Sequence, residues 1–341
     1  MSETQKRYST DDSAKSDNKQ LRCAKVLVTG AAGFVGKYLV KELMNNGHTV
    51  LTTDVLPSSD LPNYKQAELC DKDAMRLLVR ETQPDAIIHL AAISFVPDGD
   101  KDPSKLLSVN VAGTVNILDA IRYERPKCRI LFISTAQVYG PLVPVCLKDS
   151  PTPDTPNTPE NVPLFPMTMY AISKVAAEHA VSAYGQAYGI DALIARPSNH
   201  TGPGQSPKFV TASFAKQVAD VKCGKANTVR GGNLNSVRDF IDVRDVVRAY
   251  RLIIELGHTG CIYNIAANTR TRIGELLERL QKIANTNAPF EADPTLYRES
   301  DASLILNTSN LINHTNWAPE YNLDTTLSDM LSEFFTNKGR T

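Results

Sequence analysis

Short apolar runs alternate along the chain with segments whose apolar residues recur every three or four positions. The apolar runs, rich in β-branched residues, predict strands at 25–29, 49–53, 85–90, 128–134 and 191–196. The segments between them predict helices at 34–46, 72–81, 104–123 and 170–188. Repeated alternation of strand and helix is typical of an α/β fold with a doubly wound parallel sheet.

Beyond residue 197 the alternation becomes irregular, and we expect a smaller C-terminal α+β lobe to begin there. Helices are predicted at 210–222, 243–255, 273–284 and 325–335, with one strand at 261–266. The pattern therefore predicts one domain formed mainly by residues 23–196 and a second formed mainly by 197–341. Whether the two domains interleave is left open.

Two further segments differ in composition from both domains. Residues 1–22 are mainly polar and serine-rich, and we expect a disordered tail that the chemistry does not need. The stretch 141–166 holds eight prolines, which exclude a helix or an interior strand. Because it lies between a strand end and the next helix, it is either a cover over a site or a remote surface insertion.

Composition and charge are those of an ordinary globular protein. The 341 residues are 42% hydrophobic and 22% charged, and 37 basic residues balance 37 acidic ones. A formal charge of zero provides no field for nucleic acid or a membrane surface, and no apolar stretch approaches the roughly 18 residues of a membrane span. The start of the chain has no hydrophobic signal core, so we expect a cytoplasmic protein. The cysteines and histidines show no ligand spacing, and no metal is expected.

A glycine-rich turn joins the first predicted strand to the first helix. Gly30 permits a tight turn, Gly33 lets the backbone approach a pyrophosphate, and Gly36 allows the helix to pack closely on the strand. The helix N-terminus would face the phosphates. This spacing predicts a Rossmann-type dinucleotide site, with a plain glycine-rich loop as the alternative.

Asp54 follows the second predicted strand, at about the distance from the glycine turn where an acidic residue binds an adenosine ribose. Its carboxylate can accept hydrogen bonds from the ribose hydroxyls, and its charge would repel a 2′-phosphate. Asp54 therefore favours NAD(H) as the cofactor over NADP(H), which stays possible. A loop or cap aspartate is the alternative interpretation.

Tyr170 and Lys174 lie four residues apart and so share one face of a predicted helix. A phenol has a pKa of about 10, so proton transfer from it near neutral pH requires a nearby cation that lowers this value. Lys174 can supply that charge and bind a cofactor ribose, while the hydroxyl of Thr135 polarises a substrate oxygen. Together with the glycine turn these residues indicate hydride transfer. An ordinary amphipathic helix face is the alternative.

Past residue 24 the chain resembles the extended short-chain dehydrogenase/reductase superfamily. The motifs that carry the resemblance are VTGAAGFVG (28–36), HLAA (89–92), VNVAGTVNIL (109–118), ISTAQVYG (133–140), YAISK (170–174), ARPSNHTGPGQSPKFV (195–210) and SVRDFIDVRDVVRAY (236–250). The last two are most similar to GDP-4-dehydro-6-deoxy-D-mannose reductases. The resemblance implies NAD(P)H-dependent reduction of the 4-keto group of a nucleotide-linked 6-deoxy sugar, giving GDP-D-rhamnose in that family.

The resemblance also implies a role for each matching residue. Tyr170 is the general acid, Lys174 lowers its pKa and holds the nicotinamide ribose, and Thr135 contacts the sugar C4 oxygen. The implied cofactor positions are Gly30, Gly33, Phe34, Val35 and Gly36 at the pyrophosphate, Asp54 at the adenosine ribose, Asp71 at the adenine, and Ala91 and Ala92 along the cofactor. The implied positions at the nucleotide sugar are Thr135, Ala136, Asn199, Arg238 and Arg298. Two converging arginines suit a diphosphate through forked hydrogen bonds.

Three positions depart from the family pattern. Gln137 stands where related dehydratases carry an acid that takes a proton from the sugar. An amide cannot do this, so a 4,6-dehydratase is disfavoured. Ser198 replaces a phenylalanine that is usual beside the nicotinamide, and Glu299 replaces a proline after the late arginine. These two changes leave the identity of the sugar open.

Two other functions are compatible with the sequence. A nucleotide-sugar 4-epimerase uses the same residues with a tightly bound NAD. A catalytically inactive nucleotide sensor would typically lose Tyr170 or Lys174, and both are present. The family also implies a homodimer formed through helices 104–123 and 170–188, although their apolar faces could equally cover the sheet.

Overall fold

The computed structural model describes residues 21–57, 60–140, 157–297 and 304–336. Most of the expected tail 1–22 and most of the proline-rich stretch 141–166 therefore lie outside the described residues. The same holds for Arg298 and Glu299.

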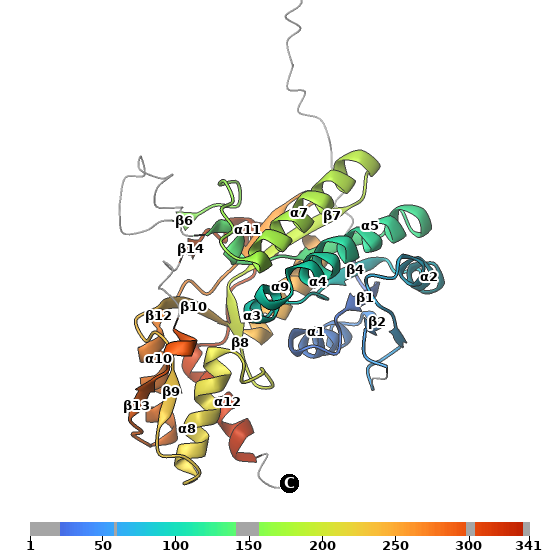
Figure 1. Cartoon of the computed structure of the whole chain (residues 1–341). Helices are drawn as coiled ribbons and strands as arrows, with labels where there is room; N and C mark the ends of the chain where they lie inside the picture. Colours follow the sequence, from blue (N-terminus) through green and yellow to red (C-terminus); the bar gives the residue numbers. More distant parts are fainter. Residues whose placement is uncertain (1–20, 58–59, 141–156, 298–303, 337–341) are drawn as a thin grey trace, which may run out of the picture.

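A seven-stranded parallel sheet forms the centre of the described structure (Figure 1). Its strands are β1 (Lys25–Thr29), β2 (Thr49–Asp54), β3 (Tyr64–Gln66), β4 (Ala86–His89), β5 (Arg129–Ile133), β7 (Ala192–Pro197) and β11 (Ile262–Ile265). They lie side by side in the order β11, β7, β5, β4, β1, β2, β3, and every neighbouring pair is parallel. Strands β4, β5 and β7 are buried along their whole length, as apolar strands covered on both faces should be.

Helices cover both faces of this sheet. On one face α1 (Phe34–Asn45), α9 (Val243–Leu256) and α11 (Ser309–Thr315) share a hydrophobic core with the strands. On the other face α2 (Lys72–Thr82), α5 (Gly113–Glu124) and α7 (Met169–Tyr188) share a second core. The prediction of a doubly wound parallel α/β sheet is confirmed.

Two elements from the C-terminal half of the chain complete the large sheet layer. Strand β11 pairs with β7, with Ile262 opposite Ile194, and thereby removes β7 from the edge of the sheet. Helix α9 covers the strands with Val246 and Ile253, both of which are wholly buried. The N-terminal and C-terminal parts of the chain thus interleave at this face.

The smaller lobe packs around a core of its own (Figure 1). Its helices are α8 (Val210–Lys222), α10 (Ile273–Ala284) and α12 (Leu323–Thr336). Its sheets join β8 (Asn199–Thr201), β10 (Val237–Asp242) and β12 (Arg270–Arg272), and separately β9 (Val229–Gly231) and β13 (Phe290–Ala292). The remaining elements are α3 (Val96–Lys101), the 3-10 turns η2 (Ala136–Tyr139) and η3 (Pro294–Leu296), and the strand pair β6 (Asn157–Thr158) and β14 (Ile305–Leu306).

The helix predicted at 104–123 is divided into three parts. Helix α4 (Pro103–Leu107) is followed by a π-helical segment, η1 (Ser108–Ala112), and then by α5. The π-helical segment holds the buried Asn110, whose side-chain amide bonds the backbone N–H and C=O of Ile93 at 2.8 and 3.1 Å. The same amide donates to Ser173 Oγ on α7 at 3.0 Å. This segment therefore ties α7 to the chain that leaves β4.

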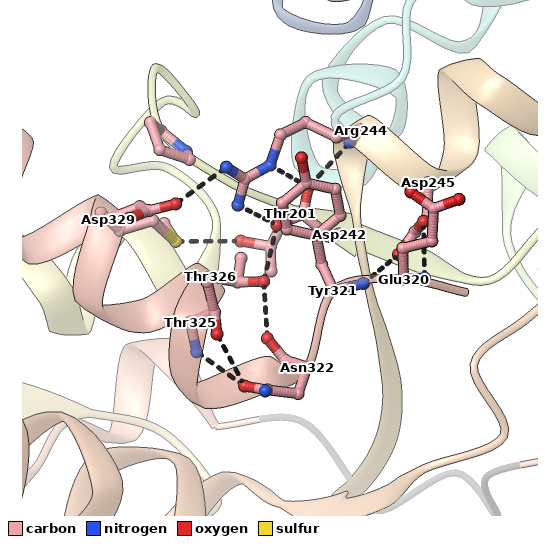
Figure 2. Close-up of polar contacts among 12 residues, drawn as sticks. Thr201, Asp242, Arg244, Asp245, Glu320, Tyr321, Asn322, Thr325, Thr326 and Asp329 are labelled. Carbon is pink, nitrogen blue, oxygen red and sulfur yellow. Dashed lines mark hydrogen bonds and ion pairs between the residues drawn. The ribbon is translucent and has the colours of Figure 1, made fainter.

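A buried aspartate at the end of β10 holds the C-terminal helix (Figure 2). Asp242 Oδ1 accepts from the backbone N–H of Arg244 at 2.8 Å, and Oδ2 accepts from Arg244 Nη2 at 2.7 Å and from Thr326 Oγ1 at 2.6 Å. The Arg244 guanidinium also pairs with Asp329 at 2.8 Å and lies 3.8 Å from the centre of the Tyr321 ring. Asp242 thus joins β10, α9 and α12 in one polar network.

Asp245, one residue beyond Arg244, fixes the segment that precedes α12. Its carboxylate accepts from the backbone N–H groups of Glu320 and Tyr321, each at 2.9 Å. Its carbonyl accepts from the indole nitrogen of Trp317 at 3.1 Å. The motif 236–250 therefore connects the large sheet layer to α12 and to the residues that precede α12.

Asp242→Ala is expected to lower the free energy of unfolding by about 3 kcal/mol, because it leaves the Arg244 guanidinium and the Thr326 hydroxyl without their buried acceptor. Urea denaturation measures this loss. Asp329→Ala is the matched control, since Asp329 is 41% exposed and its ion pair is worth less than about 1 kcal/mol. An equal loss in the two variants would contradict the role given to Asp242.

Candidate active site

A cavity of about 1150 Å³ lies at the carboxyl ends of the sheet strands, between the large sheet and the smaller lobe. The residues expected in the site that form its wall are Gly30, Gly33, Phe34, Val35, Gly36, Asp54, Ala91, Ala92, Thr135, Ala136, Tyr170, Lys174, Asn199 and Arg238. Asp71 is not part of this wall, and Arg298 lies outside the described residues. The fold therefore brings together residues from distant motifs.

The glycine turn after β1 is closely packed against the neighbouring backbone. Gly30 has a φ of +69°, and a Cβ there would lie 2.8 Å from the backbone nitrogen of Ala91. A Cβ on Gly36 would lie 2.4 Å from the Gly30 carbonyl oxygen. Helix α1 begins after Gly33 without a side-chain cap, so its first backbone N–H groups are available to an anion in the cavity. The turn therefore fits a pyrophosphate.

Asp54 is held at the end of β2, beside the glycine turn. Its Oδ2 accepts from the backbone N–H of Ala32 at 3.1 Å, and its Oδ1 accepts from that of Val55 at 2.8 Å. Each carboxylate oxygen has a second lone pair for a ligand hydroxyl. The position and the remaining acceptors fit a ribose.

Asp71 serves as the N-cap of α2, where its Oδ1 accepts from the backbone N–H of Ala74 at 2.9 Å. The adjacent residues Leu69 and Cys70 form the cavity wall instead. Its expected contact with adenine stays a prediction.

Tyr170 and Thr135 meet at the end of β5. Tyr170 lies in the first turn of α7, which Thr168 caps by accepting from the backbone N–H of Ala171 at 3.1 Å. The side chain of Thr135 lies close enough to the Tyr170 hydroxyl to lower the pKa of the phenol. Thr135 Oγ1 also accepts from the backbone N–H of Gln137 at 3.2 Å. A phenol and a hydroxyl are thus held together in the cavity wall.

Lys174 lies one turn further along α7 and is only 3% exposed. Its Nζ donates to the carbonyl of Ile133 at 2.7 Å and lies 4.9 Å from the centre of the Phe132 ring. Burial lowers the pKa of Lys174 to about 8, against the smaller raising effect of Glu178. Burial, with the charge of Lys174, also lowers the pKa of His89 to about 3, so this core histidine is neutral.

The expected lowering of the Tyr170 pKa by Lys174 is not found in the protein alone. Burial raises the pKa of Tyr170 to about 12, and the nearby side chain of Thr135 offsets this only in part. The lysine bonds the end of β5, and the low polarity around the phenol disfavours the phenolate. Tyr170 is therefore protonated at neutral pH, which is the form that a proton donor needs.

The smaller lobe contributes polar residues to the cavity wall. Asn199 lies on β8, and Arg238 lies on β10, where its Nη1 donates to the Val237 carbonyl at 2.9 Å. His200 follows Asn199 in the wall, and burial lowers its pKa. An amide, a guanidinium and an imidazole from the smaller lobe therefore belong to residues of the cavity wall.

Ser198 and Asp239 form a pair in the wall whose contact the sequence did not predict. Ser198 Oγ donates to Asp239 Oδ2 at 2.6 Å, and the carboxylate also accepts from the backbone N–H groups of Ala267 and Thr269. Burial raises the pKa of Asp239 despite these bonds. The available signal was an acid directly before the apolar pair Phe240 and Ile241, since an aspartate is rarely buried unless it is paired.

Neither a metal cluster nor a membrane-crossing helix occurs in the part of the chain that the structure describes. No group of three histidine, cysteine, aspartate or glutamate side chains there could hold a metal ion. No described helix is long and apolar enough to span a bilayer.

The protein has a parallel doubly wound sheet, a glycine turn before α1, and Thr135, Tyr170 and Lys174 at the end of β5. These features define an oxidoreductase of the short-chain dehydrogenase/reductase type. Comparison with known proteins specifies this class further. The chain belongs to the GDP-mannose 4,6-dehydratase family, whose model matches residues 27–330.

Individual relatives in this family catalyse different reactions. The chain is 35% identical to a GDP-6-deoxy-D-mannose reductase of Pseudomonas aeruginosa, over 91% of this chain and 97% of the relative. It is 30% identical to dTDP-glucose 4,6-dehydratase 1 of Escherichia coli K12, over 81% of this chain and 80% of that protein. The relationship predicted from the motifs is confirmed.

Solved structures with the same fold carry nicotinamide dinucleotides. RMD from Pseudomonas aeruginosa complexed with NADPH superposes with a TM-score of 0.80 at 33% identity, covering 92% of this chain and 99% of that one. A Thermus thermophilus UDP-glucose 4-epimerase in complex with NAD gives 0.78 at 27% identity, covering 91% and 99%.

As pH rises from 7 to 10.5, the free energy of unfolding of the wild type is expected to increase by about 2–3 kcal/mol relative to that of Lys174→Met. The pKa of Lys174 is about 8 in the folded protein and about 10.4 when unfolded, so the wild type becomes more stable as pH rises through this window. Urea denaturation of the ligand-free protein at several pH values measures the difference. Lys37→Met, at an exposed lysine on α1, should show a constant difference, and a constant difference for Lys174→Met would contradict the prediction.

Proposed function

We propose that the protein uses a reduced nicotinamide dinucleotide to reduce the 4-keto group of a nucleotide-linked 6-deoxy sugar. The favoured substrate is GDP-4-dehydro-6-deoxy-D-mannose, which would give GDP-D-rhamnose. The observation that carries the proposal is that Tyr170, Thr135 and the buried Lys174 lie in the wall of the same cavity as the glycine turn. Similarity to the Pseudomonas reductase supports the choice of sugar.

Tyr170 donates the proton that the C4 oxygen needs as it becomes a hydroxyl. Its raised pKa keeps the proton in place at neutral pH. The Thr135 hydroxyl stabilises the charge that develops on the same oxygen. The dinucleotide, when bound, supplies the hydride, and Lys174 would hold its ribose near Tyr170.

Gln137 supports a reductase over a dehydratase. It lies in the cavity wall, and its backbone N–H donates to Thr135 at 3.2 Å. Its amide side chain cannot take a proton from a sugar carbon, as a dehydration would require. Asn199 and Arg238 face the cavity from the smaller lobe and suit the diphosphate of the substrate.

For the cofactor we infer NAD(H), because the charge of Asp54 next to the glycine turn would repel a 2′-phosphate. The Pseudomonas neighbour is complexed with NADPH, so the preference rests on Asp54 of this chain. The second candidate is a nucleotide-sugar 4-epimerase, which the similarity to the NAD-containing Thermus epimerase supports.

We also infer a homodimer in the cytoplasm. Ile172 and Tyr188 on α7 and Tyr123 on α5 are large apolar side chains exposed to solvent, as expected for a face that a second copy covers. Analytical ultracentrifugation measures this state directly. The five described cysteines are all unpaired, which suits a reducing compartment.

The reductase is expected to consume NADH stoichiometrically when given GDP-4-dehydro-6-deoxy-D-mannose, whereas an epimerase would consume none.

Tyr170→Phe should lower kcat by about 10³-fold, because it removes the proton donor while the ring keeps its packing. Absorbance at the reduced nicotinamide band follows both reactions. Tyr188→Phe, on the exposed end of the same helix, should retain full activity. Full activity of Tyr170→Phe would refute the assigned role.

Asp54→Asn is expected to raise kcat/KM with NADPH relative to NADH by about tenfold or more, since it removes a negative charge near the 2′-phosphate position. Initial rates with each dinucleotide measure the ratio. Asp73→Asn is the control, because this exposed carboxylate on α2 is not part of the cavity wall. An unchanged ratio in Asp54→Asn would show that other residues select the cofactor.

A further inference from the structure

The chain crosses from the large sheet to the smaller lobe at two places that begin side by side. At the first crossing, β7 of the large sheet ends at Pro197 and β8 of the three-stranded sheet begins at Asn199. At the second, β11 of the large sheet ends at Ile265 and β12 of the three-stranded sheet begins at Arg270. Pro197 is paired with Ile265 in the large sheet, so the two crossings leave it together.

Asp239, on β10 of the three-stranded sheet, bonds both crossings. Its Oδ2 accepts from Ser198 Oγ at 2.6 Å and from the backbone N–H of Ala267 at 3.1 Å. Its Oδ1 accepts from the backbone N–H of Thr269 at 2.7 Å. Ser198 in turn donates its own backbone N–H to the carbonyl of Ile265 on β11 at 2.8 Å. One carboxylate of the smaller lobe therefore holds both segments that join this lobe to the large sheet at β7 and β11.

The groups in this contact are buried, although their residues belong to the cavity wall. Asp239 is 3% exposed and Ser198 is 8% exposed. A buried carboxylate is unfavourable unless its oxygens accept hydrogen bonds, and both oxygens of Asp239 do so within the protein. We therefore expect Asp239 to act on the reaction through the residues that it positions.

The residues that adjoin the contact in sequence belong to the expected substrate site. Asn199 and Arg238 both lie in the cavity wall. The parallel pairing of β8 with β10, with Asn199 opposite Phe240, holds these two residues relative to each other through the main chain. This pairing does not fix their distance from Thr135 and Tyr170, which belong to the large sheet layer. That distance depends on the two crossings.

We propose that Asp239 is a positioning residue that sets the distance between the diphosphate-binding residues of the smaller lobe and the reacting groups of the large sheet layer. The inference rests on the proposed function, which assigns the substrate diphosphate to Asn199 and Arg238. A substrate anchored at its diphosphate reacts only when its C4 carbon lies correctly at the other end, and a misplacement of about 1 Å can lower the rate by about a hundredfold. Asp239 thus controls the rate of reduction without touching the sugar.

Asp239→Asn tests this role. Either orientation of the new amide places an NH₂ group against a backbone N–H, that of Ala267 or that of Thr269, so one of these donors loses its acceptor. We expect kcat for GDP-4-dehydro-6-deoxy-D-mannose to fall about tenfold or more, whereas the Kd for GDP and the Kd for NADH, from calorimetric titration, stay within about twofold of the wild type. Ser198→Ala removes a single bond and should lower kcat by a smaller factor.

Asp245→Asn is the matched control. Asp245 is also buried and also accepts from two backbone N–H groups, those of Glu320 and Tyr321, but it is not part of the cavity wall. This variant should lose stability against urea as Asp239→Asn does, because it too leaves a buried donor without its acceptor. Its kcat should stay within about twofold of the wild type.

The possible outcomes are distinct. Unchanged kcat in both Asp239→Asn and Ser198→Ala overturns the inference and leaves the proposed function standing; if Asp239→Asn does not fold, Ser198→Ala decides. A Kd for GDP that rises as much as kcat falls also overturns the inference, because Asp239 would then form the anchor instead of aligning it. An equal fall of kcat in Asp245→Asn overturns it too, because lost stability would then explain the effect. If the wild type oxidises no NADH with this substrate, the inference and the proposed function both fail.

Discussion

The hydrogen bond from Lys174 Nζ to the carbonyl of Ile133 determines how the rest of the site is arranged. It joins α7 to the end of β5, so that Tyr170 and Thr135, on different elements, lie in the wall of one cavity. A buried ammonium is unfavourable unless it is bonded, which makes this contact specific. Burial lowers the pKa of Lys174, and burial also raises the pKa of Tyr170, which keeps the phenol protonated.

A second constraint comes from the segment that joins β10 to α9. Asp242 and Asp245 bond α12 and the residues before it, while Arg238 and Asp239, on the strand that precedes them, lie in the cavity wall. One stretch of sequence therefore sets the position of the smaller lobe and part of the wall that faces the reacting groups.

Much of this architecture could be predicted from local patterns. The helices at 210–222 and 273–284 were predicted with the bounds observed, since their apolar periodicity is a property of the segment itself. Short strands such as β8 and β10 were missed because their pairing, Phe240 opposite Asn199, joins residues far apart in sequence. The spacing of Tyr170 and Lys174 indicated that they share one helix face, and both lie in the cavity wall. It could not reveal their pKa values, which depend on burial by other elements.

The interleaving at β11 and α9 also governs how the chain acquires its fold during synthesis. A nascent polypeptide that ends near residue 200 would lack an edge strand and one helical cover, leaving Leu193 and Ile133 without the core that buries them. The strands that precede residue 200 therefore depend on α9 and β11 for part of their core. Exchange of the C-terminal half between relatives would therefore also replace one strand of the large sheet and the helix that covers it.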